Sequence, residues 1–241
     1  MIFVSLVYIC AVMIKRFFPI TAFFLLCIPI TLWGQDYEVT FLGIPVVRVH
    51  IQQIPDDNPT LVTYEYTART NPFFSAIYKV NNRYRVTMDT SMSRIVSYEK
   101  KISQKNFQQS FHTQYKPEKT IYSTGDERIS ETGRHTMLSL LLALTRVNTP
   151  REFSIPLEIE GAYYSALMIP REKNSNILEW EILLLPDGGS SVLATTDLFT
   201  SRLADPEAQR FIRVDISSGH IVAARFTLSP YTLTARILGD S

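Results

Sequence analysis

Apolar and polar residues alternate with a period of two along most of this chain, a pattern typical of strands with one buried face. The alternation is clear from Val47 to Ile51 and again from Val62 to Ala68. Further runs of this kind follow up to Leu238, with turn-forming residues between them. The pattern predicts about ten strands, and the short connections predict antiparallel pairing of consecutive strands.

Two apolar stretches extend this pattern. Phe73–Val80 is followed by Asn81-Asn82, a dipeptide typical of a tight turn, so a hairpin is expected there. The later run Phe107–Tyr115 is expected to be a strand that places three aromatic side chains on one face, those of Phe107, Phe111 and Tyr115.

The stretch His135–Val147 does not follow the period of two, and its apolar residues lie nearly all round a helix. A helix of about a dozen residues at ~1.5 Å per residue is under ~20 Å long, too short to cross a bilayer. We therefore expect it to be buried by the strands on either side. The predicted fold is mainly β, a large curved antiparallel sheet or open barrel of about ten strands packed on one apolar helix at about 135–147, in a single domain from 35 to 241.

The N-terminal residues 1–34 are predicted to be a signal segment for export. Lys15 and Arg16 precede a long apolar run, and cleavage is expected near Gly34. Because a signal peptide begins with charge, Met13 is the better start of translation. An uncleaved membrane anchor is the alternative interpretation of this segment, and a periplasmic or otherwise exported location follows from the signal interpretation.

Both cysteines, Cys10 and Cys27, lie in this segment, so no disulfide is expected in the β domain. Leu26 is larger than the residue that lipidation requires before a cysteine, and a lipid anchor is therefore not expected. Removing Lys15 and Arg16 leaves 22 basic residues of 24 against 23 acidic ones, a net charge of −1. This balance excludes a typical nucleic-acid-binding protein.

Several segments together resemble the bacterial envelope family catalogued as domain of unknown function 3108. The resemblance covers about two thirds of the domain, is weaker after Pro170, and rests on Tyr37–Pro45 (YEVTFLGIP), Ala68–Asn71 (ARTN), Ile77–Val80 (IYKV), Ser97–Ile102 (SYEKKI), the pair Leu138-Ser139, and Arg146. An aromatic residue of the family is absent from Leu140–Leu144. The resemblance implies an exported, mostly antiparallel β protein similar in outline to open-barrel carriers of hydrophobic cargo, and it brings no catalytic residues.

No catalytic motif stands out in the sequence. His50, His112, His135 and His220 lack the spacing of metal ligands, so no catalytic residue, metal or cofactor is predicted and the protein is not expected to be an enzyme.

Charged residues in the strands are expected to face solvent. This expectation covers the acidic pairs Glu158/Glu160 and Glu179/Glu181, each of which could alternatively lie in a cleft. Lys100, Lys101 and Lys105 are expected to protect an exposed strand edge, and the alternative is a basic cluster that binds anionic lipid or glycan.

The predicted helix carries a narrow stripe of small and polar residues, namely Thr136, Ser139, Ala143 and Arg146. In a structural interpretation Ser139 bonds to backbone and Arg146 pairs with an acidic strand residue. In a functional interpretation the stripe faces a cavity and Arg146 binds the head group of an amphipathic ligand. The candidate ligand-binding residues are therefore Ser139 and Arg146, together with the aromatic face formed by Phe107, Phe111 and Tyr115.

The leading hypothesis is a non-enzymatic envelope protein that binds or carries an apolar or amphipathic, lipid-like ligand. The alternative is a structural or assembly protein whose groove is filled by its own helix and whose outer surface binds an envelope partner protein. A hydrolase of envelope glycans is a weaker third hypothesis. Cavity volume separates the first two, because a ligand site requires an apolar pocket of about 300 Å³ or more beside the helix.

Overall fold

The computed structural model describes residues 34–90, 94–129, 134–174 and 176–239. The predicted signal segment, with both cysteines, lies outside these residues except for Gly34. The chain divides between Leu32 and Trp33, and the unit Trp33–Ser241 contains every element described below. No helix among the described residues combines the length and apolar character needed to cross a membrane.

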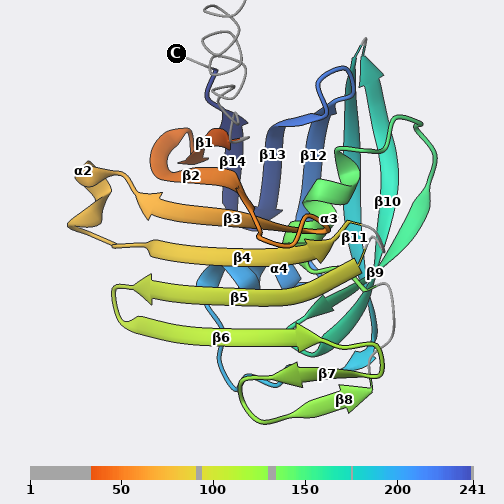
Figure 1. Cartoon of the computed structure of the whole chain (residues 1–241). Coiled ribbons are helices and arrows are strands. Elements are labelled where there is room, and N and C mark those ends of the chain that lie inside the picture. Colours follow the sequence, from red (N-terminus) through yellow and green to blue (C-terminus); the bar gives the residue numbers. More distant parts are fainter. Residues whose placement is uncertain (1–33, 91–93, 130–133, 175, 240–241) are drawn as a thin grey trace, which may run out of the picture. The chain divides into compact units, whose positions relative to one another are not determined.

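The described residues fold into one curved antiparallel sheet that does not close on itself (Figure 1). Its strands are β1 (Gly34–Phe41), β2 (Ile44–Pro55), β3 (Leu61–Thr70), β4 (Asn81–Asp89), β5 (Arg94–Gln104), β6 (Phe107–Tyr115), β7 (Lys119–Tyr122), β8 (Glu127–Ile129), β9 (Phe153–Ile159), β10 (Ala162–Asn174), β11 (Ile177–Gly189), β12 (Gln209–Asp215), β13 (His220–Leu228) and β14 (Tyr231–Ile237). The predicted fold class is confirmed, with fourteen strands in the described residues in place of about ten.

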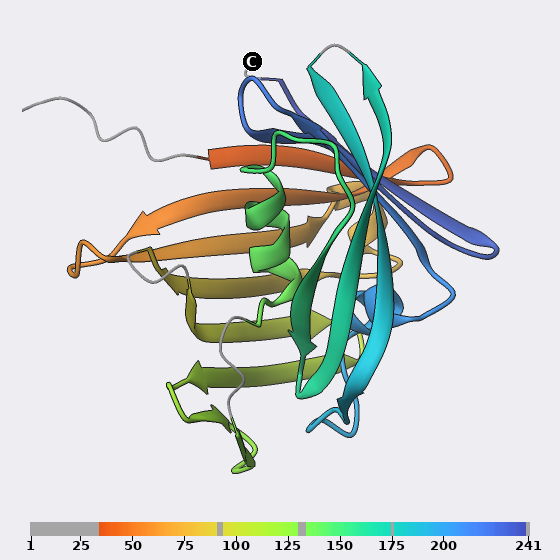
Figure 2. The ribbon, with the colours of Figure 1, turned by 90° about the vertical axis from the view of Figure 1, so that its right-hand side faces the viewer.

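Two meanders make up the sheet. Strands β1 to β8 follow one another on one side and β9 to β14 on the other, and the two sets join where β1 pairs with β14. The edge strands are therefore β8 and β9. Helix α3 (Met137–Leu144) lies in the chain between the two sets and is enclosed by the sheet (Figure 2).

The period of two in the sequence corresponds to an inner and an outer face. Along β4, Tyr84, Val86 and Met88 are buried, whereas the alternate residues Arg83 and Arg85 lie on the outer face. The outer face is held by ion pairs across neighbouring strands, such as that between Arg85 and Glu65, whose Nε and Oε2 atoms are 2.5 Å apart. Alternation of this kind fixes the register of each strand, because a slip by one residue would bury the arginines.

Helix α3 fills the inside of the curved sheet. Leu138, Leu140, Leu142 and Leu144 are buried in the same core as the inner faces of the strands. Tyr66 on β3 donates a hydrogen bond to the carbonyl oxygen of Leu138 at 3.1 Å. The predicted role of the helix as the core of the curved sheet is confirmed.

The helix is shorter than the predicted range 135–147. Thr136 caps its N-terminus, and the hydroxyl of Ser139 accepts a hydrogen bond from the Thr136 backbone N–H at 2.9 Å, forming a capping box. His135 lies before the cap and pairs with Leu157 on β9 as a bridge. The chain leaves the helix after Leu144, so the predicted last turn is not helical.

Two segments differ from the predicted pattern. The stretch Phe73–Val80 is no strand, because Pro72 begins the short helix α2 (Pro72–Ser75) and the segment is mostly exposed. Asn81 and Asn82 belong to strand β4 and form no turn. A further helix, α4 (Leu198–Ala204), follows the capping residue Asp197 in a region without a clear apolar period.

Candidate functional site

A lysine lies in the interior of the sheet. Lys100 is on β5 between Tyr98 and Ile102, and strand alternation places all three on the inner face. In register with it lie Tyr84 on β4 and Phe111 on β6. The Lys100 side chain is completely excluded from solvent.

Oxygen atoms from distant parts of the chain surround the Lys100 ammonium group. It donates hydrogen bonds to Glu160 Oε1, to Thr196 Oγ1 at 2.8 Å, and to Asp197 Oδ2 at 3.2 Å. Thr196 in turn donates to Glu160 at 2.8 Å. The Nζ atom of Lys100 also lies over the Phe111 ring, 5.9 Å from the ring centroid. Isolated burial of an ammonium is very costly, and these partners replace the water it has lost.

The prediction that Lys100 protects an exposed strand edge is wrong. Strand β5 has neighbours on both sides, and Lys100 faces the core. Lys101 is exposed and pairs with Glu99, and Lys105 is exposed in the turn after β5. One signal in the sequence does favour the observed orientation: Lys100 shares its face with the apolar residues Tyr98 and Ile102.

The hairpin between β9 and β10 brings two carboxylates inside. Glu158 and Glu160 are both buried, so the predicted solvent-facing position of this pair is wrong. Glu160 has a φ of +53°, and Gly161 follows with a φ of +91°, so the tight turn carries the Glu160 side chain inward. The other predicted acidic pair, Glu179 and Glu181, does lie on the outer face, ion-paired to arginines.

Burial raises the pKa of the Glu158 carboxyl group. The Tyr122 hydroxyl donates to its Oε1 atom at 2.9 Å, which partly offsets this effect. Burial likewise raises the pKa of the Tyr84 hydroxyl, which donates to Asp197 Oδ1 at 3.2 Å. Both groups are therefore held in their neutral form over a wider pH range than in water.

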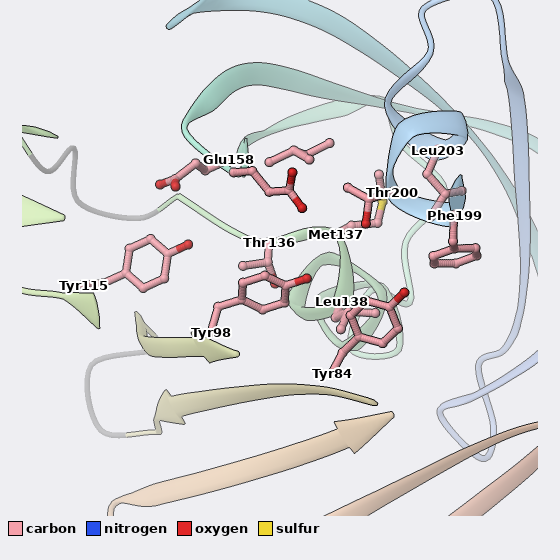
Figure 3. A pocket seen from close by; sticks show the side chains of 12 residues that line it. Tyr84, Tyr98, Tyr115, Thr136, Met137, Leu138, Glu158, Phe199, Thr200 and Leu203 are labelled. Atoms are coloured by element: carbon pink, nitrogen blue, oxygen red, sulfur yellow. The ribbon is translucent and has the colours of Figure 1, made fainter. Parts of the chain in front are cut away.

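A small cavity lies beside these groups, between the sheet, α3 and α4 (Figure 3). Its volume is about 40 Å³. It is lined by tyrosines of the sheet (Tyr84, Tyr98 and Tyr115), by the start of α3 (Thr136, Met137 and Leu138), by the end of β9 and the turn after it (Glu158, Ile159 and Glu160), and by α4 (Phe199, Thr200 and Leu203). Helix α4 forms one wall of the cavity although none of its residues is fully buried.

The arrangement closes the interior. Asp197 binds Lys100 and also caps α4 by accepting hydrogen bonds from the backbone N–H and the hydroxyl of Thr200, at 3.0 and 2.7 Å. Glu160 ties the β9–β10 turn to the same lysine. The Lys100 cluster, which we define as Lys100, Glu160, Thr196 and Asp197, therefore holds three separate segments together.

The five candidate ligand-binding residues do not gather around the cavity. Only Tyr115 lines it. Ser139 is buried in the capping box, Phe111 stacks on Tyr122 with a centroid distance of 6.2 Å, and Phe107 packs at the margin of the core. Arg146 lies in the turn after α3 and is exposed, so it does not extend the stripe of small and polar residues along the helix.

Sequence reasoning missed Asp197 and Tyr84 as members of this site. An Asp followed three residues later by Thr200 is a plausible N-cap signal, but the segment around it lacks apolar periodicity. Among the described residues no group of three or more His, Cys, Asp or Glu side chains is placed to hold a metal ion. His50 is bonded to Asp36 at 3.0 Å on the outer surface.

Comparisons with known proteins give one structural likeness. No family model matches the chain, and no curated protein matches its sequence. The fold is similar to the crystal structure of a β-barrel-like protein of domain of unknown function DUF1849 from Brucella abortus, with a TM-score of 0.55 and 7% identity over 85% of this chain and 95% of that chain. The likeness shows a shared barrel-like fold, in agreement with the predicted fold class.

Proposed function

We propose that this chain is an exported, non-enzymatic protein of a bacterial cell envelope that works as a structural or assembly protein through its outer surface. The apolar N-terminal segment supports export, and the resemblance to domain of unknown function 3108 supports the envelope. One observation carries the choice between carrier and assembly protein, namely the small space left inside the sheet.

The cavity beside α3 is too small for a lipid-like ligand. A cavity of about 40 Å³ holds a few water molecules at most. Binding sites for small organic molecules are about 300–1,000 Å³. Helix α3 occupies the space that cargo would need, with Leu140 and Leu144 completely buried. The sheet thus binds a segment of its own chain.

The buried ionisable groups favour a structural role over catalysis. A general base or nucleophile needs an atom that a substrate can reach. The ammonium of Lys100 is engaged by three oxygen atoms, and the carboxylate of Glu160 accepts from both Lys100 and Thr196. Lys100 is thus bonded to both carboxylates of the cluster, so the cluster stabilises the closed interior.

Mass spectrometry of lipids that co-purify with the protein tests this proposal. The protein is purified without denaturation from the envelope of its native host, extracted with organic solvent and compared with an unrelated exported protein of similar size. We expect no lipid at more than trace stoichiometry. One lipid per protein molecule would overturn the assembly function in favour of a carrier.

A carrier with α4 as a lid is the second candidate, because α4 covers the cavity without fully burying any of its own residues. Asp197→Asn weakens the ion pair that holds this helix. If the protein is a carrier, this variant should take up more of a fluorescent fatty acid than the wild type. Equal, negligible uptake by both proteins is expected for an assembly protein. Ser201→Ala, an exposed change on the same helix, serves as the control.

A further inference from the structure

Exposed apolar side chains gather at one end of the sheet. Of the ten large apolar residues that are exposed in the described part of the chain, six lie on turns at this end. We call them the tip surface: Leu42 and Ile44 beside the β1–β2 turn, Phe73, Ile77 and Tyr78 between β3 and β4, and Tyr231 at the β13–β14 turn. Phe73 is the most exposed of the six, at 81%.

Ring contacts and hydrogen bonds between these turns make them neighbours in space. The Phe41 and Tyr231 rings are 5.8 Å apart, which joins the β13–β14 and β1–β2 turns. Asn71, just before α2, donates to the carbonyl oxygen of Pro45 at 3.1 Å. Figure 2 shows the β1–β2 and β13–β14 turns projecting on the same side.

The β5–β6 turn adjoins the same surface. Lys105 donates to the carbonyl oxygen of Ile77 at 3.1 Å, and Tyr78 donates to Gln104 Oε1 at 3.1 Å. Four turns, distant in sequence, thus present one surface.

Basic residues predominate in the turns of the tip surface and in the strand ends next to them. Residues 41–48, 66–83, 101–107 and 225–236 contain no Asp or Glu and carry eight Lys or Arg residues, namely Arg48, Arg69, Lys79, Arg83, Lys101, Lys105, Arg225 and Arg236. Lys79 and Lys105 are exposed beside the apolar side chains. Carboxylates lie next to this region: Glu38 is in register with Arg48 and Arg236, Glu99 pairs with Lys101, and Glu65 pairs with Arg83. The exposed Glu207 lies just before Gln209, which is in register with Thr227 beside the β13–β14 turn. An apolar surface with a cationic border complements a surface that is apolar inside and anionic outside.

We propose that the tip surface binds an anionic phospholipid bilayer, inserting its apolar side chains at the level of the head groups while the lysines contact lipid phosphates. This proposal rests on the proposed function, because it names the partner of the outer surface. Aromatic and aliphatic side chains with a basic border are the combination that holds proteins at a membrane interface. A protein partner would complement the apolar side chains equally well, but the exposed Lys79 and Lys105 beside them favour the anionic membrane.

Vesicle flotation tests the proposal. The unit Trp33–Ser241 is used because it contains the whole described core, and circular dichroism and thermal melting verify its folding. We expect it to float with vesicles of phosphatidylethanolamine and phosphatidylglycerol (3:1) in 0.1 M salt, and at least about tenfold less with phosphatidylcholine vesicles or in 0.5 M salt. Absence of flotation with the anionic vesicles would overturn the proposal.

Matched variants locate the contact. Phe73→Ser with Ile77→Ser, and separately Lys79→Glu with Lys105→Glu, are each expected to lower the vesicle partition coefficient at least about tenfold with unchanged melting. Ile129→Ser with Leu185→Ser changes exposed apolar residues elsewhere and is expected to leave it unchanged. An equal loss of vesicle binding in the control variant would contradict the proposal, because the contact would then lie elsewhere. Binding of a protein partner to the tip surface, without any vesicle binding, would also contradict it.

The same assay separates this proposal from the proposed function. A fluorescent phospholipid in the vesicles reports whether lipid leaves with the protein. Flotation without lipid transfer supports both the membrane-binding tip surface and the assembly function. Flotation with stoichiometric transfer supports the tip surface and overturns the assembly function, whereas loss of flotation overturns the tip surface alone.

Discussion

The Nζ atom of Lys100 lies 3.2 Å from Oδ2 of Asp197, and both side chains are completely excluded from solvent. Lys100 belongs to a strand in the middle of the first meander, and Asp197 caps α4, which lies between β11 and β12 of the second meander. The ion pair therefore connects parts of the chain that share no strand pairing. Its strength depends on Glu160 and Thr196, which complete the oxygen shell of the ammonium.

Lys100→Met tests this connection. The change leaves Glu160 and Asp197 buried without their cation, and breaking a buried ion pair from one side costs about 3–5 kcal/mol. We expect a loss of that size in the free energy of unfolding measured with urea. Lys101→Met, next to it on the exposed face, is expected to change the value by less than ~0.5 kcal/mol. A loss below about 1 kcal/mol in the first variant would mean that the cluster is hydrated.

Ser139→Ala tests the helix cap. The hydroxyl accepts from the Thr136 backbone N–H and donates to its carbonyl oxygen at 3.1 Å, inside the core. Loss of a capping interaction costs about 1 kcal/mol, and we expect at least this because the freed N–H is buried. Urea unfolding measures it, with the exposed Ser110→Ala as the control. Equal stability of both variants would contradict a stabilising role for the capping box.

The strands were predictable because their alternation is local. Tyr84, Val86 and Met88 show it plainly, and the sequence alone predicts the side of the strand that is buried. The helix was predictable because its leucines break that period. The end of the helix was not predictable, since Arg146 is compatible with a further helical turn. Only the course of the chain after Leu144 shows that the helix ends there.

The candidate site was largely beyond sequence reasoning. Lys100, Glu160 and Asp197 are each ordinary surface residue types, and their burial depends on meeting one another across 60 and 97 positions. No local sequence pattern predicts these contacts, because the compensating charge comes from another part of the chain. The shared face of Lys100 with Tyr98 and Ile102 was the one local hint.

Gly189→Ala tests the close approach that shapes the Glu160 turn. Gly189 has a φ of +66°, and an added Cβ would lie 2.6 Å from the carbonyl oxygen of Gly161. Backbone strain and this clash are together expected to cost about 2–4 kcal/mol in unfolding free energy. Gly188→Ala has the same kind of positive φ but nothing within 4 Å, so it isolates the conformational part and should cost about 1 kcal/mol. Equal effects would contradict the clash.

The raised pKa of Glu158 predicts a pH dependence. The folded state keeps its proton to higher pH than the unfolded state, whose carboxyl has a pKa of 4.5. The resulting stability is fully present below pH 4.5 and is lost as the pH rises through the higher pKa of the folded state. Glu158→Gln keeps an acceptor for Tyr122 and cannot ionise, so the variant should gain stability relative to the wild type as the pH rises above 4.5.

Thermal melting between pH 4 and pH 8 measures this difference. Glu127→Gln, an exposed change on β8, is the control and should not show the same rise. Parallel melting curves for the wild type and Glu158→Gln would contradict the role of Glu158.

Strand β1 pairs with β2 on one side and with β14 on the other. Beyond β14, the backbone N–H of Leu238 donates a hydrogen bond to the carbonyl oxygen of Asp36 at 2.8 Å. All other strand pairs of the described sheet join neighbours in sequence. Each half of the sheet can thus fold from local contacts, but the seam between them forms only when the C-terminal end of the chain is present. A chain that stops before Tyr231 would expose β1 and β13 as two additional unpaired edges, so premature termination converts a folded protein into one prone to aggregate through its centre.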